Sequence, residues 1–450
     1  MTRPSLRESP LWAETAWPPA HRAWNGVLLL TLASICSYVD RFLLVLLIGP
    51  IQHDLAISDV QFSLLTGPAF VFLYVLLGVP FARAADLFSR RAVIATGIAL
   101  WSLATAACGL ASTFGQLFLA RMAVAVGEAA LTPAAYSWIA DSFTPARRAR
   151  PTVTFAMGAY LGAGLAMILG GAAAAAIGVE GAIDLFGIIT LRAWQVAFVM
   201  VGLPGLLLAL TIAVIVPEPG RRGRPDQAST TQVIAHLRQN ARAFCGSSLS
   251  FALFLILPTA FMAWVPAFLM RVHGVAAAQV GLIYGIILVA AVFLGSHVGS
   301  RIVDHLAARG RRTPAIDAAL IGMGGSLPFI LLMPFAGTLP ATITSLALAS
   351  FFFGIVNGMP ALILTQMCPG RMRATAFSLY FVFASIVAAG VGPVLIAIIS
   401  EYILGDQKMI GVALAVTAIV VVPVAIAALL WSRTPYASCV RLLEQEEQLS

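Results

Sequence analysis

Residues 31–50 read TLASICSYVDRFLLVLLIGP, an apolar run that two charged residues, Asp40 and Arg41, interrupt near its middle. The run extends back to Trp24, and a helix needs only about 20 apolar residues to cross a bilayer. A charged side chain at that depth costs about 2.5–3.5 kcal/mol or more, so it predicts a functional site. Because no small-residue cleavage site follows, we expect a retained membrane helix and not a signal peptide.

The composition of the whole chain extends this interpretation. Hydrophobic residues make up 60% of the 450 positions and charged residues 10%, whereas soluble domains are about a quarter charged. Apolar runs long enough to span a membrane predict twelve helices, at 24–49, 60–84, 91–111, 114–140, 150–177, 193–216, 244–271, 278–303, 313–335, 340–367, 373–400 and 409–432.

Arginine placement predicts the orientation of these helices. Every second connection is basic, beginning with the segment before the first helix, while the alternate loops hold only Arg192, Arg271 and Lys408. The positive-inside rule then places both termini in the cytoplasm. This explains the net charge of +8 without nucleic acid, and it makes anionic membrane lipids the expected partners of the arginines.

Other chemistries lack a sequence signal. The five cysteines have no paired spacing, so we expect neither a disulfide framework nor a metal site. No cofactor motif and no arrangement of a nucleophile with a base is present, and the chain is therefore not predicted to be an enzyme.

One long polar segment, residues 217–243, divides the chain. It predicts five parts: an N-terminal cytoplasmic segment (1–23), a six-helix bundle (24–216), a cytoplasmic linker (217–243), a second six-helix bundle (244–432) and a cytoplasmic tail (433–450). A short surface helix is expected in the linker around 229–240.

The two halves resemble each other. Asp86, followed by Arg90 and Arg91, lies after the second predicted helix, and Asp304, followed by three further arginines, lies 218 positions later, after the eighth. A second arginine pattern recurs at an offset of 223 positions, from Arg148 to Arg371. Such duplication is typical of transporters whose substrate site lies between the halves near the bilayer midplane.

With these features the chain resembles transporters of the major facilitator superfamily. The segment ARAADLFSRR after the second helix is similar to the signature Gly-x-x-x-Asp-Arg-x-Gly-Arg-Arg, keeping Asp86, Arg90 and Arg91 but not its glycines or its first arginine. The resemblance implies twelve helices in two bundles that rock about a central site. It also implies that Asp86 and Asp304, with Arg90 and Arg91, belong to a gating motif; an alternative is a plain orientation signal.

Narrower features resemble the Spinster-type branch. They are Ser37-Tyr38-Val39-Asp40-Arg41-Phe42 in the first helix and Arg121, Gly127-Glu128-Ala129 and Pro133 in the fourth. This resemblance implies a lysolipid or sphingoid cargo and a multi-pass protein of the plasma membrane, the inner membrane in a bacterium. Organic-anion symporters of the same superfamily share the Asp-Arg and Gly-x-x-Glu-Ala elements, and they are the competing assignment.

The four intramembrane charges are the candidate transport site. Arg121 and Glu128 are two helical turns apart and share a face. At a rise of about 1.5 Å per residue, Asp40 and Arg121 reach similar depths on helices one and four, and we expect them to pair.

Their chemistry favours proton coupling. Burial raises the pKa of a carboxyl group and a nearby arginine lowers it, so Asp40 and Glu128 are predicted proton carriers. Arg121 and Arg41 are predicted charge partners or anchors for an anionic substrate. A static ion pair that fixes helix register, or coupling to sodium, remains open as an alternative.

The second half carries aromatic residues and, apart from His297 and small polar groups, no charge well inside an apolar run. Tyr38, His297 and Asn357 are candidate cavity-lining residues, with plain packing as the alternative. A charged wall facing an apolar wall would suit a small amphiphile. We therefore predict a monomeric, proton-coupled transporter of an amphiphilic or anionic substrate; a receptor on the same fold would bind without flux.

Overall fold

The computed structural model describes residues 17–144, 147–177, 182–185, 189–220, 230–369 and 372–449. Within them, twelve helical segments are long and apolar enough to cross a membrane, as the sequence predicts. They are Ala20–Leu46, Asp59–Leu87, Arg90–Cys108, Phe114–Ser142, Arg150–Ala172, Ala193–Ile215, Ala241–His273, Ala277–Ala308, Pro314–Phe335, Leu339–Gln366, Thr375–Ile403 and Gln407–Leu443.

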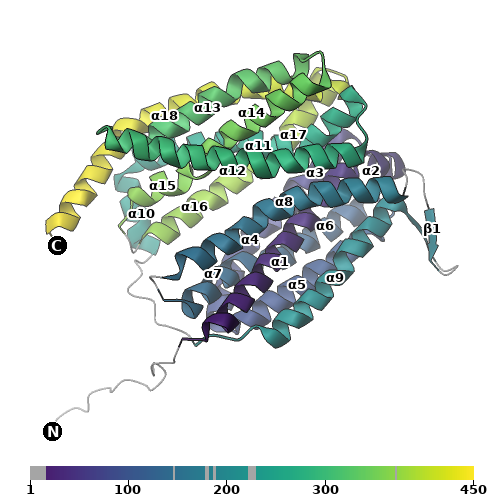
Figure 1. Ribbon diagram of the computed structural model, residues 1–450, viewed down its shortest axis with the longest axis horizontal. Coiled ribbons are helices and arrows are strands. Elements are labelled where there is room, and N and C mark those ends of the chain that lie inside the picture. Colours follow the sequence, from purple (N-terminus) through teal and green to yellow (C-terminus); the bar gives the residue numbers. More distant parts are fainter. Residues whose placement is uncertain are drawn as a thin grey trace, which may run out of the picture.

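The first six spans form one bundle (Figure 1). Its helices are α1 (Ala20–Leu46), α2 (Ile48–Leu55), α3 (Asp59–Thr66), α4 (Pro68–Leu87), α5 (Arg90–Cys108), α6 (Phe114–Glu128), α7 (Leu131–Ser142), α8 (Ala149–Ile177) and α9 (Ala193–Ile215). Between α8 and α9, strands β1 (Ala182–Leu185) and β2 (Ile189–Arg192) pair in an antiparallel hairpin that projects from the bundle.

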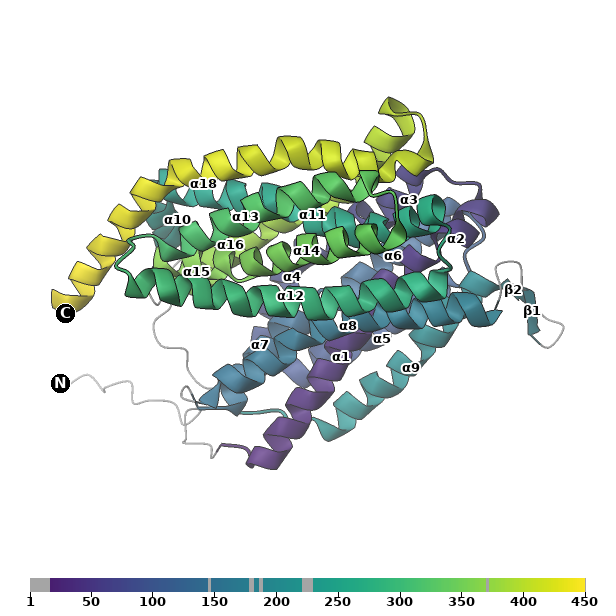
Figure 2. The same cartoon turned by 45° about the horizontal axis from the view of Figure 1, so that its top comes forward.

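The last six spans form the second bundle, which lies above the first in Figure 2. Its helices are α11 (Ala241–His273), α12 (Ala277–Ala308), α13 (Pro314–Leu332), α14 (Leu339–Asn357), α15 (Met359–Gln366), α16 (Arg373–Ser385), α17 (Gly392–Ile398) and α18 (Ile410–Leu449). The π-helical segments η4 (Ile386–Val391) and η5 (Ile399–Ile403) continue the span of α16 and α17, and the short 3-10 turns are η3 (Met333–Phe335) and η6 (Gln407–Met409).

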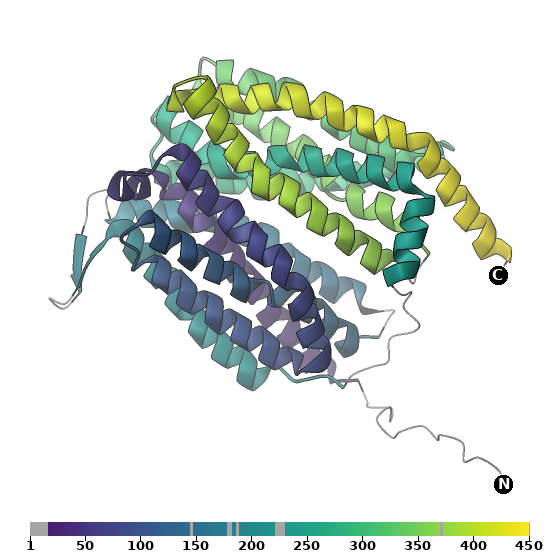
Figure 3. The ribbon, with the colours of Figure 1, turned by 180° about the vertical axis from the view of Figure 1, so that it is seen from behind.

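The molecule has two distinct ends. One, here called the linker end, holds the start of α1, the end of α18 and helix α10 (Thr230–Gln239), which connects the bundles. The opposite one, called the hairpin end, holds α2, α3 and the β hairpin. Seen from behind in Figure 3, α3 and α4 run beside α16 and α17 at the hairpin end and diverge from them toward the linker end.

The outer surface is apolar, as a membrane requires. Large side chains such as Phe72, Leu207 and Val214 are 65%, 69% and 70% exposed on the bundle exterior. In a soluble protein these side chains would be exposed to water, which would be costly. In a bilayer they contact lipid tails, which are as apolar as leucine. Exposed apolar helix faces are therefore the expected surface of a protein that spans a bilayer.

The bundles meet along two different seams. Along α8 and α12, Gly281 lies so close to the main chain that an added Cβ would approach the Met167 carbonyl oxygen to 2.1 Å. Small residues permit this approach of two continuous helices. On the opposite side, Gly67, at the break between α3 and α4, packs against the Ala389 carbonyl of the π-helical segment η4.

The predicted linker and tail are partly described. Residues 1–16 of the N-terminal segment and 221–229 of the linker lie outside the described residues, as does Arg371. The short helix expected near 229–240 is α10, in which Val233 is buried and His236 bonds to the Met367 carbonyl at 2.8 Å. The predicted tail is helical to Leu449, because α18 continues through it.

Candidate functional site

Matching breaks in the two bundles mark the centre of the molecule. The fourth span breaks between α6, which ends at Glu128, and α7, whose Pro133 follows closely; the tenth breaks between α14, which ends at Asn357, and α15, which carries Pro360. Interrupted helices at corresponding positions of two repeats are the best structural pointer to a transport site. Both end on polar residues that the sequence singles out.

An ion pair joins α1 to α6 at this level. Arg41 donates through Nη2 to Oε2 of Glu128 at 2.7 Å, and the Ser37 hydroxyl donates to the same oxygen at 2.6 Å. The Glu128 side chain is fully buried, and its other oxygen, Oε1, has no hydrogen-bond partner. The carboxylate is thus hydrogen-bonded through one oxygen only.

Aromatic rings surround the Arg41 guanidinium. Its carbon lies 4.0 Å from the centroid of Phe70, 4.8 Å from Tyr38 and 5.2 Å from Tyr74. These distances fall within the range of cation–π attraction, which strengthens as water is excluded. Arg41 nevertheless keeps 19% of its side chain exposed, so it remains accessible to a ligand.

Asp40 occupies a separate environment behind α1. It is 2% exposed, and its Oδ2 accepts a bond from the Thr105 hydroxyl of α5 at 2.8 Å. Its other oxygen, Oδ1, has no partner. Neighbouring helix positions point about 100° apart, so Asp40 faces α5 while Arg41 faces α6.

Arg121 does not pair as the sequence predicts. It is fully buried, and its two terminal nitrogens donate to main-chain carbonyls, that of Asp40 at 3.3 Å and that of Arg41 at 3.4 Å. The cross-helix ion pair is instead Arg41–Glu128. Depth along the helices favoured the Asp40–Arg121 pair, whereas the direction of the side chains around α1 brings Arg41 to Glu128.

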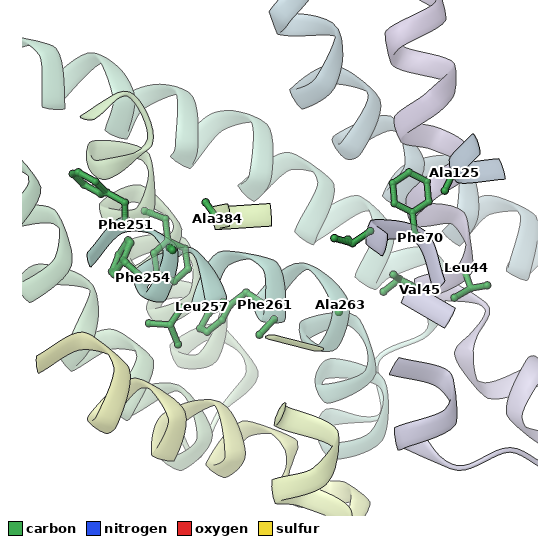
Figure 4. Close-up of a cluster of buried hydrophobic side chains, with 14 of the residues drawn as sticks. Leu44, Val45, Phe70, Ala125, Phe251, Phe254, Leu257, Phe261, Ala263 and Ala384 are labelled. Atoms are coloured by element: carbon green, nitrogen blue, oxygen red, sulfur yellow. The ribbon is translucent and has the colours of Figure 1, made fainter. Parts of the chain in front are cut away.

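An apolar cavity of about 170 Å³ lies in the second bundle. Phe251, Phe254 and Phe261 of α11 line it. Figure 4 shows these three side chains, together with Phe70, Leu44 and Val45 of the first bundle. The lining of the cavity is mostly aliphatic and aromatic, with the polar groups Tyr284, Ser350, Asn357 and Tyr380. Among the described residues, Ala163 of α8 is the one lining residue from the first bundle. Such a cavity favours a hydrocarbon chain, with few points for hydrogen bonding.

The three predicted cavity-lining residues have different positions. Asn357 lines the cavity, and Tyr38 contacts the Arg41 guanidinium instead. His297 lies on the exposed face of α12, where its ring packs on Phe293 at 4.7 Å. The cavity-facing side of α12 carries Tyr284, Leu288 and Val292, and His297 projects from the other side, so the prediction for His297 is wrong.

The predicted gating residues divide into two groups. Asp86 and Asp304 are exposed at the linker end. Arg90 is buried: it pairs with Asp141 of α7 and donates to Ser137 at 2.9 Å. The main-chain N–H of Arg91 donates to Glu218 at 2.9 Å. Arg90 therefore holds the first bundle together internally.

The sequence prediction missed these internal partners and others. Glu218 caps the start of α5 by accepting bonds from Ser89 and from two main-chain N–H groups, and Arg433 pairs with Asp317 at 2.6 Å in the second bundle. At the hairpin end, Arg192 pairs with Asp54 and Arg271 with Asp59. A usable signal was present, because Arg192 and Arg271 are the two arginines that break the alternation of basic loops.

Comparison with known proteins places this geometry in context. The family description Major Facilitator Superfamily matches residues 30–393. An MFS-type efflux pump of Mycolicibacterium smegmatis is 30% identical over 86% of each chain, and protein spinster homolog 1 of Rattus norvegicus is 28% identical over 83% of this chain and 72% of its own.

Solved structures agree with the sequence relatives. A bacterial homologue of the human lysosomal transporter Spinster, in an inward-facing and unoccupied conformation, superposes with a TM-score of 0.78 at 26% identity, covering 94% of this chain and 98% of that one. A structure of a bacterial Spinster homologue in an inward-facing, occupied conformation gives a TM-score of 0.74 at 26% identity, covering 95% of this chain and 97% of that one.

Proposed function

The chain belongs to the Major Facilitator Superfamily and is a Spinster-like secondary transporter, and on this premise we propose that it uses a proton gradient to move an amphiphilic, lysolipid-like substrate. The observation that carries the proposal is the pair between the partly exposed Arg41 and the fully buried Glu128, beside a break in the fourth span. Alternating access would move the two bundles around this site.

Glu128 is the proposed first proton carrier. Its carboxylate depends on one charged donor, Arg41, and its second oxygen is unpartnered. Protonation would release Arg41, and approach of Arg41 would favour release of the proton. Asp40, with one free oxygen and Thr105 as its hydroxyl partner, is the proposed second carrier.

Arg41 is the proposed anchor for an anionic headgroup, and Arg121 is a positioning residue. Arg41 retains exposed surface, whereas Arg121 is fully buried against main-chain carbonyls. A headgroup that bound Arg41 would compete with Glu128 for the same guanidinium. Substrate and proton would then bind cooperatively, because a protonated Glu128 leaves Arg41 free.

The cavity in the second bundle favours a substrate with an apolar tail. Each methylene group buried in its cavity would contribute about 0.8 kcal/mol, and the cavity offers few polar groups in competition. A small organic anion would use only the Arg41 side, and it is the second candidate because the Arg41 guanidinium is accessible. A register-fixing ion pair alone would account for neither the free carboxylate oxygens nor the cavity.

Orientation and location complete the proposal. The basic connections support a cytoplasmic linker end in a bacterial inner membrane, with the chain acting as a monomer. The exposed Asp86 and Asp304 at that end would take part in gating there when the bundles close. The proposed linker, residues 217–243, lies between the bundles in the sequence, and α11 begins at Ala241, near the end of that segment.

Transport under imposed pH gradients tests proton coupling. Purified protein in liposomes should take up a radiolabelled lysolipid faster with a proton gradient, and Glu128→Gln and Asp40→Asn should lose that acceleration. Exchange of substrate without a gradient should persist in at least one variant. Gradient responses equal to wild type in both variants would disprove the proton assignment.

The substrate class is tested in the same liposomes. Lysolipid and a small dicarboxylate should be compared at equal concentration, with and without Arg41→Ala. Uptake of lysolipid alone, abolished in Arg41→Ala, supports the amphiphile. Uptake of the dicarboxylate alone would identify an organic-anion symporter.

A further inference from the structure

A three-residue network joins the two bundles at the hairpin end. Arg271, near the end of α11, donates from Nη1 to Oδ2 and from Nη2 to Oδ1 of Asp59, each at 2.8 Å. Gln52 of α2 closes the ring: it accepts from Arg271 at 2.7 Å and donates to Asp59 at 2.7 Å. The paired geometry between guanidinium and carboxylate is the strong, directional form of this interaction.

Both charges are also favoured by the helices that carry them. Asp59 is in the first turn of α3 and Arg271 in the last turn of α11, where the helix dipoles favour an acid and a base respectively. Asp59 is fully buried, and Arg271 is 19% exposed. The buried Asp59 carboxylate accepts three hydrogen bonds, which compensate for the hydration it lost on burial.

A second contact between the bundles supports the first, and in this one the acidic residue belongs to the second bundle. Glu401, in η5 of the second bundle, accepts a bond from the main-chain N–H of Val60 at 3.0 Å, again at the start of α3. The rings of Phe62 and Trp264 meet edge to face at 6.4 Å one turn further along α3. The short helix α3 is thus held by the second bundle, although it belongs to the chain of the first.

We propose that Asp59, Gln52 and Arg271 form a latch that holds the hairpin end closed and must break in each transport cycle. The helix is interrupted at Gly67, between α3 and α4, and this interruption would let α3 change its angle relative to α4 when the latch opens. The latch rests on the proposed function only through alternating access; it does not depend on the substrate or on proton coupling.

Spin-label distances test the latch without any substrate. Labels on Leu110→Cys and Phe335→Cys report the hairpin end, since both positions are exposed there and belong to opposite bundles. The exposed Cys245 is replaced by serine. In Asp59→Asn and in Arg271→Gln, the ratio of long to short distances should rise by about tenfold, equivalent to about 1.4 kcal/mol.

Three further variants make the result specific. The double variant Asp59→Asn/Arg271→Gln should shift no more than the larger single variant, because one interaction is lost in all three. Arg271→Lys should keep part of the closure. Asp54→Asn is the matched control, since it breaks the Arg192 and Trp194 contacts of Asp54 at the same end but within the first bundle.

The outcomes separate clearly. Unchanged distances in both folded single variants would overturn the latch, and so would an equal shift in Asp54→Asn. Because the distances are measured in apo protein, they remain informative if the transport assays fail. Conversely, a working latch with no lysolipid uptake would contradict only the proposed substrate.

Discussion

The two bundles share one fold and differ in what they bury. The first buries Asp40, Arg121 and Glu128 at membrane depth, with Arg41 beside them. The second places an apolar cavity next to the matching helix break at Asn357. A duplicated scaffold can therefore bury charged residues in one repeat and enclose an apolar cavity in the other, because each bundle is stabilised internally by its own packing.

The largest effect should come from removing the cation of the charged site in the first bundle. Arg41→Ala leaves the fully buried Glu128 without its cation, and losing one partner of a buried pair costs about 3–5 kcal/mol. We expect gradient-driven uptake to fall at least tenfold, by about 1.4 kcal/mol or more. Initial uptake rates in liposomes measure this.

Arg41→Lys provides the matched control. It keeps the charge but loses the planar face that stacks on Phe70 at 4.0 Å, and it should retain intermediate uptake. Uptake by Arg41→Ala equal to that of wild type would show that a positive charge at this position is unimportant.

Filling the apolar side should change selectivity more than rate. Leu288→Trp adds volume to the second-bundle cavity, and overpacking of an apolar site typically costs about 1–3 kcal/mol. The apparent KM for a long-chain lysolipid should rise by about tenfold (about 1.4 kcal/mol), while a short-chain analogue is spared.

Leu207→Trp, on the exposed face of α9, is the control and should change neither value. If the two chain lengths respond equally to Leu288→Trp, the cavity does not hold the tail.

The internal ion pairs offer a smaller comparison of the same two bundles. Arg90–Asp141 has side chains 5% and 12% exposed, whereas Arg433–Asp317 has 37% and 15%. Asp141→Asn should therefore lower the melting temperature more than Asp317→Asn, because exposed pairs contribute only about 0–1 kcal/mol. Thermal unfolding in detergent compares them, and a reversed order would contradict the burial argument.

The smallest effect concerns a thiol at the linker end of the second bundle. Burial raises the pKa of the Cys368 thiol to about 12, and the thiolate is the reactive form. Because the raised pKa keeps the thiol protonated below that value, maleimide labelling of Cys368 at pH 7–8 should be slow and should increase only as the pH approaches 12. Mass spectrometry of the peptides detects the labelled Cys368. Rapid labelling at pH 7 would show that the packing around Cys368 opens.

Side chains at the site show where prediction from sequence stops. The depth of Asp40 and Arg121 followed from counting residues along helices, and depth alone favoured their pairing. The pair that forms is Arg41–Glu128, and Arg121 binds the main-chain carbonyls of α1 instead. The prediction that His297 lines the cavity failed in the same way, since the position of a residue along α12 does not show which side of the helix faces the cavity.

The sequence by itself determined the twelve spans, the duplication, and which residues carry charge into the membrane. Those features depend on local hydrophobicity and on the spacing of residues along the chain. Only the tertiary structure decided the partners: Glu128 with Arg41, Asp40 with Thr105, and Asp59 with Arg271. Partner choice depends on rotation about each helix axis and on which helices become neighbours, and packing of the whole bundle sets both.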